Sequence, residues 1–243
     1  MNEQIDPHRV EAFYQAVRQT IDDLTAAWTR FNIRNRGYNL SRPTEKAAPA
    51  RYLAVLGLGA HVFSASAQAT VLLDPGNGMV AGPLVRLMFE AGVTAVWVAE
   101  HEGAWQGFFN ESSRQKRNLL KGMASVVPGE DLDQLNIDLE LDDTHDDPAR
   151  HFERRCHEFT RGEQLYAHYR MLSAVCHAGA VLSDPYLSVA PNGQVTGFHE
   201  NPDPALDPHQ IFTWLAGVSL HFAVSAVAAI ATNDVKGVCC TDR

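Results

Sequence analysis

Apolar residues recur every three or four positions through most of the chain, and this spacing predicts α-helices. In the first such segment, about 7–34, the apolar positions follow one another at steps of four and three: Val10, Tyr14, Val17, Ile21, Leu24, Trp28 and Phe31. Steps of this kind form one continuous seam along a helix. The seam either pairs with a second chain or packs on the protein's own bundle, and the second outcome is commoner for a short seam.

The same spacing, together with residues that start and stop helices, predicts the remaining elements. Helices are expected at about 50–73, 83–102, 105–123, 148–182 and from 208 onward. Three of the predicted helices follow an Asp-Pro pair, in which Asp caps free N–H groups and Pro fits the first turn: Asp6-Pro7, Asp147-Pro148 and Asp207-Pro208. Residues 186–198 alternate around Pro-Asn-Gly, which predicts a β-hairpin.

Together these elements predict an all-α fold: a helical bundle with an N-terminal heptad helix and a small β-hairpin insert near 186–198. We expect residues 1–48 to form a helical extension and linker, and residues 49–235 to form the bundle domain. The segment "LGLGA" at 56–60 lacks the preceding strand and the third glycine of a nucleotide-binding loop. Its small residues are therefore expected to allow close helix packing.

The composition is that of an ordinary globular protein. The chain has 243 residues, of which 45% are hydrophobic and 20% charged, and its formal net charge is −9. Residues 130–147 contain nine acidic residues and no basic one, and lack the Gly and Glu of an EF-hand, so we expect a solvated acidic loop there. The negative charge argues against a dedicated DNA- or RNA-binding protein but leaves room for a local basic patch.

One segment, 211–231, carries no charge over 21 residues, which is long enough to cross a bilayer. It is diluted by small and hydroxyl residues, has His221 at its centre and lacks flanking Lys or Arg clusters. We therefore expect a buried central helix and no membrane span. The N-terminus is polar and none of the four cysteines forms a C-x-x-C pair, so we expect reduced thiols and a cytoplasmic location.

Charged side chains stand inside two otherwise apolar helical segments. Arg86 and Glu90 lie four residues apart in 83–103, and Arg170, Ser173 and His177 share a stripe within "HYRMLSAVCHAG". An unpaired buried charge is unfavourable, so we expect the two stripes to meet, with Glu90 accepting a hydrogen bond from the second stripe.

Metal and cofactor sites are not predicted. His145, His151 and His157 recur every six residues and so point to different helix faces. In "HEFTR", Arg161 replaces the second His of an H-E-x-x-H site, and no Walker loop is present.

The segments "VRLMFEAG" and "YRMLSAVCHAG" resemble the signature helices of an uncharacterised bacterial all-helical domain family. That family combines an Arg-x-x-x-Glu helix with a later Tyr-Arg-x-x-Ser-x-x-x-His helix. The chain matches this pattern at Arg86, Glu90, Tyr169, Arg170, Ser173 and His177, within a similarity that covers roughly residues 50–230. The resemblance implies a helical bundle and no established activity.

More distantly, Arg170 and His177 resemble the R-x(4–6)-H pair of HEPN-type ribonucleases, which are metal-independent and usually dimeric. This resemblance implies that His177 is the general base for an RNA 2′-OH and that Arg170 stabilises the charge on the phosphorane. The chain departs from the HEPN pattern at Met171, where Asn, Asp or His is usual. Seven helical residues also separate the pair by about 10 Å, so a second copy is expected to complete the site.

Two functions of different classes follow. In the first, the protein is structural or an interaction protein, and its Arg, Glu, Ser and His side chains form a buried polar network. In the second, it is a HEPN-like endoribonuclease, such as a toxin or a phage-defence effector. An enzyme requires Arg170 and His177 to reach solvent, whereas a structural network is closed to water. We expect a homodimer, RNA as a candidate substrate, and neither DNA nor a membrane as a partner.

Overall fold

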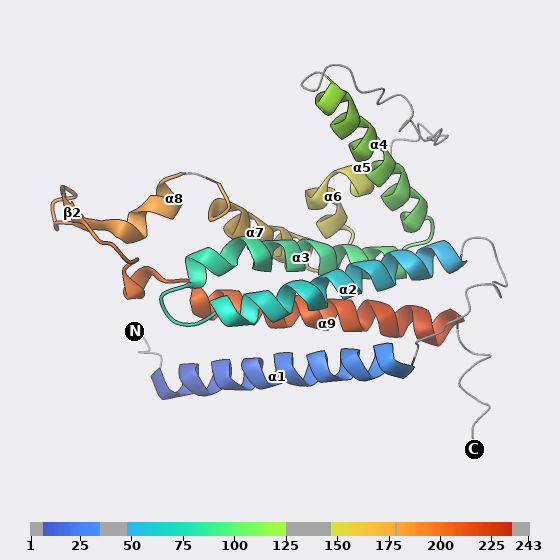
Figure 1. Cartoon of the computed structure of the whole chain (residues 1–243), viewed down its shortest axis with the longest axis horizontal. Helices are drawn as coiled ribbons and strands as arrows, with labels where there is room; N and C mark the ends of the chain where they lie inside the picture. Colours follow the sequence, from blue (N-terminus) through green and yellow to red (C-terminus); the bar gives the residue numbers. More distant parts are fainter. Residues whose placement is uncertain (1–6, 35–47, 125–146, 178, 235–243) are drawn as a thin grey trace.

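The computed structural model of the chain describes residues 7–34, 48–124, 147–177 and 179–234. The described residues are mostly helical and include a two-stranded antiparallel sheet, as Figure 1 shows. The predicted all-α class and the hairpin insert are therefore confirmed. The predicted linker and the predicted acidic loop fall almost entirely outside the described residues.

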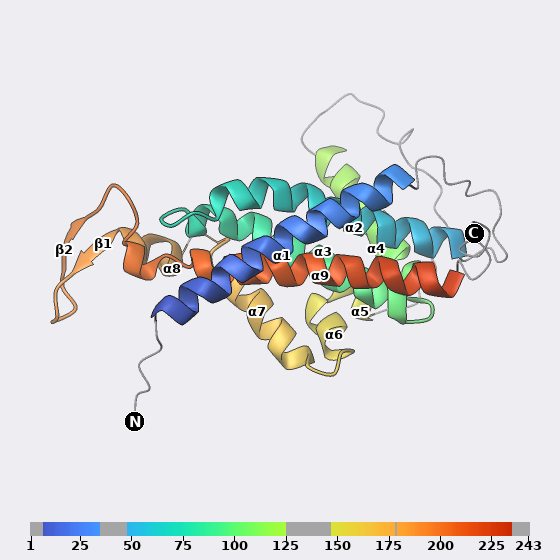
Figure 2. The same cartoon turned by 90° about the horizontal axis from the view of Figure 1, so that it is seen from below.

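Four long helices lie side by side and form the bundle (Figures 1 and 2). They are α1 (Pro7–Arg34), α2 (Ala48–Leu72), α3 (Gly78–Glu100) and α9 (His209–Asp234). α3 is the most enclosed, because every residue from Ala91 to Ala99 is buried. Gly92 lets α3 approach α9 closely: a Cβ atom there would lie 2.8 Å from the carbonyl oxygen of Ser219.

Three of the described helices are long and apolar enough to cross a membrane, by length and composition alone: Pro49–Leu72, Gly78–Glu100 and His209–Ile230. Only the last of these was weighed as a span from the sequence. In the structure α9 contacts α1, α2 and α3, but only half of its apolar window is buried and His221 at its middle is exposed.

Helix α1 packs through its heptad seam on the protein's own bundle. Ile21 is buried at the middle of the seam, and the ring of Trp28 stacks on Phe63 of α2 with centroids 4.6 Å apart. Glycines make this contact close: a Cβ at Gly217 of α9 would lie 3.1 Å from Val17, and one at Gly59 would lie 3.3 Å from Trp28. Gly59 thus has the packing role expected for the "LGLGA" segment, whereas Gly57 has no neighbour within 4 Å of an added Cβ.

The single helix predicted over 148–182 is wrong. After α4 (Ala104–Ala124), this stretch forms four short elements: α5 (Asp147–Arg150), α6 (Phe152–His157), α7 (Gly162–Ala174) and α8 (Ala180–Ser183). The break before α7 depends on Gly162, because a Cβ atom there would collide with the backbone of Cys156 and His157. A continuous helix would not bring these backbones together.

Residues 180–206 form an arm that extends away from the bundle in both views (Figures 1 and 2). The arm contains α8, η2 (Asp184–Tyr186), β1 (Leu187–Val189), β2 (Val195–Phe198) and η3 (Pro204–Leu206). Leu187 pairs with Phe198, and Gly193 turns the hairpin at a φ of 81°, where an L side chain is strained. Strand β2 is exposed along its whole length.

The prediction that Asp207 caps the helix that follows it is wrong. Its carboxylate does not cap α9, the helix that follows it. It accepts hydrogen bonds from the backbone N–H groups of Gly76 and Gly78, the latter at 2.9 Å, and so caps the start of α3. The side chain is 1% exposed, and Nδ1 of His209 lies 3.0 Å from its second oxygen. Asp207 therefore ties the turn between α2 and α3 to the start of α9.

Candidate functional site

Arg86 and Tyr169, two residues of the resemblance, meet where α3 packs against α7. Nη2 of Arg86 donates a hydrogen bond to the Tyr169 hydroxyl at 2.8 Å, and the guanidinium carbon lies 5.1 Å from the centre of the Tyr169 ring. The hydrogen bond to Tyr169 raises the pKa of Arg86, with smaller support from the nearby Glu90 carboxylate. Helices α3 and α7 therefore meet at Arg86 and Tyr169, and Tyr169 is not part of the predicted stripe of Arg170, Ser173 and His177.

Two buried polar atoms at this junction have no hydrogen-bond partner among the described residues. They are Nε of Arg86 and Oγ of Ser173. Ser173 follows Tyr169 by one helical turn. Cys176 lies three residues after Ser173 and interacts electrostatically with Arg86. The junction is therefore not a fully satisfied hydrogen-bond network. Unsatisfied buried groups of this kind lower the free energy of unfolding by about 1–3 kcal/mol each.

Arg170 and His177 lie on the outside of the same segment. Both are exposed, and α7 ends at Ala174, so His177 lies three residues beyond the helix and not on it. Within the described part of the chain, the side chain of Glu90 makes no hydrogen bond to Arg170, Ser173 or His177. A polar network closed to water therefore does not include Arg170 or His177.

Two charged residues that the sequence analysis did not single out, Arg155 and Glu111, are buried in the described part of the chain and make polar contacts there. Arg155 is 8% exposed and donates from Nη1 to Thr94 at 2.6 Å and from Nη2 to the carbonyl oxygen of Ala149 at 2.7 Å. Its guanidinium carbon also lies 5.1 Å from the centre of the Trp97 ring. These contacts hold α5 and α6 against α3.

Glu111 is also 8% exposed and anchors the base of α4. Its carboxylate accepts hydrogen bonds from Arg114 at 2.6 and 2.7 Å and lies 4.0 Å from Nε of Arg150. The bond from Arg114 lowers the pKa of Glu111.

A signal for both residues was present in the sequence. Arg155 stands three residues after Phe152, and Glu111 stands three residues after Phe108, so each shares a helix face with an aromatic residue.

Beside the α3–α7 junction lies a pocket of about 460 Å³, here called the basic pocket. α5, α6 and the residue between them contribute Arg150, His151, Glu153, Arg154 and Arg155, and α3 contributes Glu90. The rings of Tyr166 and Tyr169 line it from α7. Two of the six residues of the resemblance, Glu90 and Tyr169, thus line this pocket together with three arginines.

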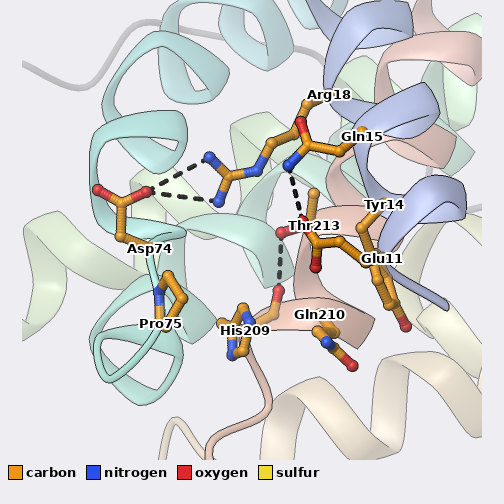
Figure 3. Close-up of a pocket in the computed structure, with 9 residues that line it drawn as sticks. All are labelled: Glu11, Tyr14, Gln15, Arg18, Asp74, Pro75, His209, Gln210 and Thr213. Atoms are coloured by element: carbon orange, nitrogen blue, oxygen red, sulfur yellow. Dashed lines mark hydrogen bonds and ion pairs between the residues drawn. The ribbon is translucent and has the colours of Figure 1, made fainter. Parts of the chain in front are cut away.

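A second pocket, of about 160 Å³, lies between α1, the turn after α2 and the start of α9 (Figure 3). In Figure 3 the guanidinium of Arg18 points toward Asp74, with Nη1 3.3 Å from the carboxylate. Arg18 also donates to the carbonyl oxygen of Leu73 at 2.6 Å. The charge of Arg18 is therefore engaged in joining α1 to the bundle, and this pocket is the weaker candidate for a ligand.

The described residues give little support to a metal site or a reactive cysteine. They contain no group of three or more His, Cys, Asp or Glu side chains placed to hold a metal ion. Cys156 is fully buried, and burial raises the pKa of its thiol to about 12, which excludes a reactive thiolate at neutral pH. The thiol of Cys176 is 3.1 Å from the carbonyl oxygen of Leu172.

Comparison with known proteins adds no assignment. No protein-family model, no curated protein and no solved structure matches the chain. The structure shows a helical protein with buried polar contacts at Arg155 and Glu111.

Proposed function

We propose that the chain is a HEPN-like, metal-independent endoribonuclease in which His177 and Arg170 act on RNA. The observation that carries this proposal is that both side chains are exposed, while Tyr169, the residue next to Arg170, is fixed to α3 by Arg86. Solvent access is the property that separates an enzyme from a closed structural network. The HEPN resemblance supplies the chemistry.

In the proposed reaction the His177 imidazole takes the proton of an RNA 2′-OH. The 2′ oxygen then attacks the adjacent phosphorus, and the bond from phosphorus to the 5′ oxygen breaks. The leaving 5′ oxygen takes up a proton, so the products carry a 2′,3′-cyclic phosphate and a 5′-OH. Arg170 stabilises the negative charge that the phosphoryl oxygens gain in the transition state. We further propose that two copies of the chain form the working enzyme and that it acts in the cytoplasm.

A structural or interaction role is the second candidate. The half-buried hydrogen bond from Arg86 to Tyr169 supports it, because this contact joins two helices and so has a structural role. Under this candidate, wild type does not cut RNA, and Tyr169→Phe lowers the free energy of unfolding by about 1–2 kcal/mol.

The test measures cleavage of a labelled single-stranded RNA by the full-length protein in the presence of EDTA. Wild type should release a fragment ending in a 2′,3′-cyclic phosphate. His177→Ala should lower the rate at least about 100-fold, because general base catalysis contributes factors of this size. Arg170→Ala should lower it as well. Neither variant should lose more than about 0.5 kcal/mol of stability, because both side chains are exposed.

His221→Ala is the matched control, since His221 is also exposed but lies on α9. It should cleave like wild type. A wild-type protein that leaves RNA intact, or a His177→Ala protein that keeps full activity, overturns the proposal. Purification without detergent tests the location, because a protein that requires detergent has its three apolar helices in a membrane.

A further inference from the structure

Helix α2 has two apolar faces, of which one packs on α3 and α9 (Figure 1) and the other is exposed. Six residues of the exposed face follow one another at steps of four and three and are here called the outer seam: Leu53, Gly57, Ala60, Ser64, Ala67 and Val71. This order repeats every seven residues, which is the spacing of a helix that pairs with another helix.

The exposed face of α2 carries no charged side chain. Residues 52–73 contain no Asp, Glu, Lys or Arg. The exposed face of a helix in water normally carries charges, and that of α1 does, for example at Arg9 and Asp22. Leu53 and Val71, at the two ends of the outer seam, are 48% and 71% exposed. The outer seam thus has the composition of a surface that another apolar surface covers.

Gly57 has no packing role within its own copy. A glycine inside a helix lowers stability relative to alanine, so its presence calls for a close contact. Gly59 makes such a contact with Trp28, whereas a Cβ atom at Gly57 would meet no atom within 4 Å. The residues that follow Gly57 along the outer seam, up to Ala67, are also small. A second helix can therefore approach the middle of the outer seam closely.

The order of residues in the outer seam fits a second copy of the same helix. The seam is symmetric about position 62, with the larger Leu53 and Val71 at its ends and small residues between them. Two such helices that cross antiparallel about a two-fold axis are closest at the small residues, and the larger ends fill the space where the helices diverge.

The charges around the outer seam agree with this arrangement. The nearest charged residues before and after it are Arg51 and Asp74, which are opposite in sign. Each is bound within its own copy, Arg51 to the carbonyl oxygen of Val98 and Asp74 to Arg18. Antiparallel pairing brings Arg51 of one copy toward Asp74 of the other, so like charges do not face each other, although each chain has a net charge of −9. It also sets the start of each helix beside the end of the other, which favours their dipoles.

We propose that two copies of the chain associate through the outer seams of α2, packed antiparallel about a two-fold axis at position 62. The outer seam is about 27 Å long, and one helix pair of this length buries less than the roughly 1,600 Å² of a standard interface. The dimer should therefore dissociate in the micromolar range. This inference names the surface through which the two copies of the proposed function associate, and it holds whether or not the protein cleaves RNA.

Sedimentation velocity of the full chain, over roughly 1–100 µM, measures the dissociation constant. Wild type should form a dimer within this range. Ala60→Glu introduces a charge at the middle of the outer seam and should raise the dissociation constant at least about tenfold. Ala26→Glu, the same change at an exposed position of α1, should have much less effect. Circular dichroism shows whether each variant folds, and Ala67→Glu replaces Ala60→Glu if that variant does not.

Cysteine variants test the orientation of the two helices. Leu53→Cys and Val71→Cys are mixed in equal amounts and treated with a short bismaleimide, which joins two thiols through thioether bonds. The mixture should form a covalent dimer well above the level that wild type gives. Either variant alone should not, because in the antiparallel pair the two equivalent residues lie about 27 Å apart.

A wild type that stays monomeric at every concentration overturns the inference, even if it cleaves RNA. A dimer that Ala60→Glu leaves intact overturns it too, as does efficient cross-linking of either cysteine variant alone. A protein that is soluble only in detergent assigns the outer seam to lipid and likewise overturns the inference. A dimer that passes both tests in a protein that leaves RNA intact keeps the interface and overturns only the proposed catalysis.

Discussion

The bundle and the arm place their apolar side chains in opposite surroundings. Phe89 on α3 is 0% exposed, with Phe152 and Phe222 at its edges, whereas Phe198 on β2 is 81% exposed. The bundle buries its apolar surface among α1, α2, α3 and α9, and this burial provides most of the folding free energy. A two-stranded hairpin is marginally stable by itself. The bundle thus provides the stability of the fold, and the arm exposes apolar surface to solvent.

The largest expected effect is in the bundle. Phe89→Ala should lower the free energy of unfolding by about 3–5 kcal/mol, because it removes a buried ring and leaves a cavity. Urea unfolding followed by circular dichroism measures this loss. Leu87→Ala, two residues away on α3 but 44% exposed, is the control and should change stability by less than about 1 kcal/mol. Equal losses in the two variants would mean that α3 is not enclosed as described.

Asp207 stands where the arm returns to the bundle, and its loss should rank second. Asp207→Ala leaves the N–H groups of Gly76 and Gly78 without their acceptor, which should lower stability by about 2–4 kcal/mol. Asp203→Ala is the matched control: Asp203 caps the N–H of Ala205 within the arm and should matter little. A variant at Asp207 that melts like wild type would show that the bundle does not depend on this cap.

How far the sequence predicts these two regions depends on whether their contacts are local. The α1 seam is a local pattern, and the predicted range 7–34 agrees with the helix found. The hairpin follows from Pro-Asn-Gly in the same way. The break before α7 depends on Gly162 packing against Cys156, and the cap of α3 depends on Asp207, which lies 129 residues after Gly78. The second contact leaves no local pattern, whereas the first joins residues six positions apart, and Gly162 was its local signal.

The candidate site was also predicted only in part. That α3 and α7 meet was predicted, because each carries a charged stripe in an apolar helix. The contact runs from Arg86 to Tyr169, since helix rotation and crossing, which residue types do not specify, decide which side chains face each other. The same uncertainty in rotation explains why Arg170 was expected in a network and is found exposed. Arg155 was missed because its acceptors are Thr94 and backbone carbonyls, not a carboxylate.

A third prediction concerns the response of the bundle to acid. His168 is half-buried between Phe89 and Trp214, and burial lowers its pKa below the ordinary 6.5. The neutral ring is therefore favoured in the folded state. Its contribution to stability is fully present above pH 6.5 and decreases as the pH falls toward the folded-state pKa.

His168→Gln should consequently show a smaller loss of stability between pH 7 and pH 5 than wild type, by less than about 1 kcal/mol. Urea unfolding at the two pH values measures the difference. Identical pH dependence in wild type and His168→Gln would show that this ring is as accessible to protons in the bundle as in the unfolded chain.

The smallest change in stability is expected for a substitution in the arm, on β2. Phe198→Ala should change the free energy of unfolding by no more than about 0.5 kcal/mol, because a ring that is 81% exposed loses little contact when it is removed. The measurement is a melting curve at several protein concentrations. If the expected homodimer covers the arm, the melting temperature of wild type rises with concentration, and Phe198→Ala removes that rise. A large loss of stability that is the same at every concentration would mean that Phe198 packs within its own chain and would end the contrast between the two regions.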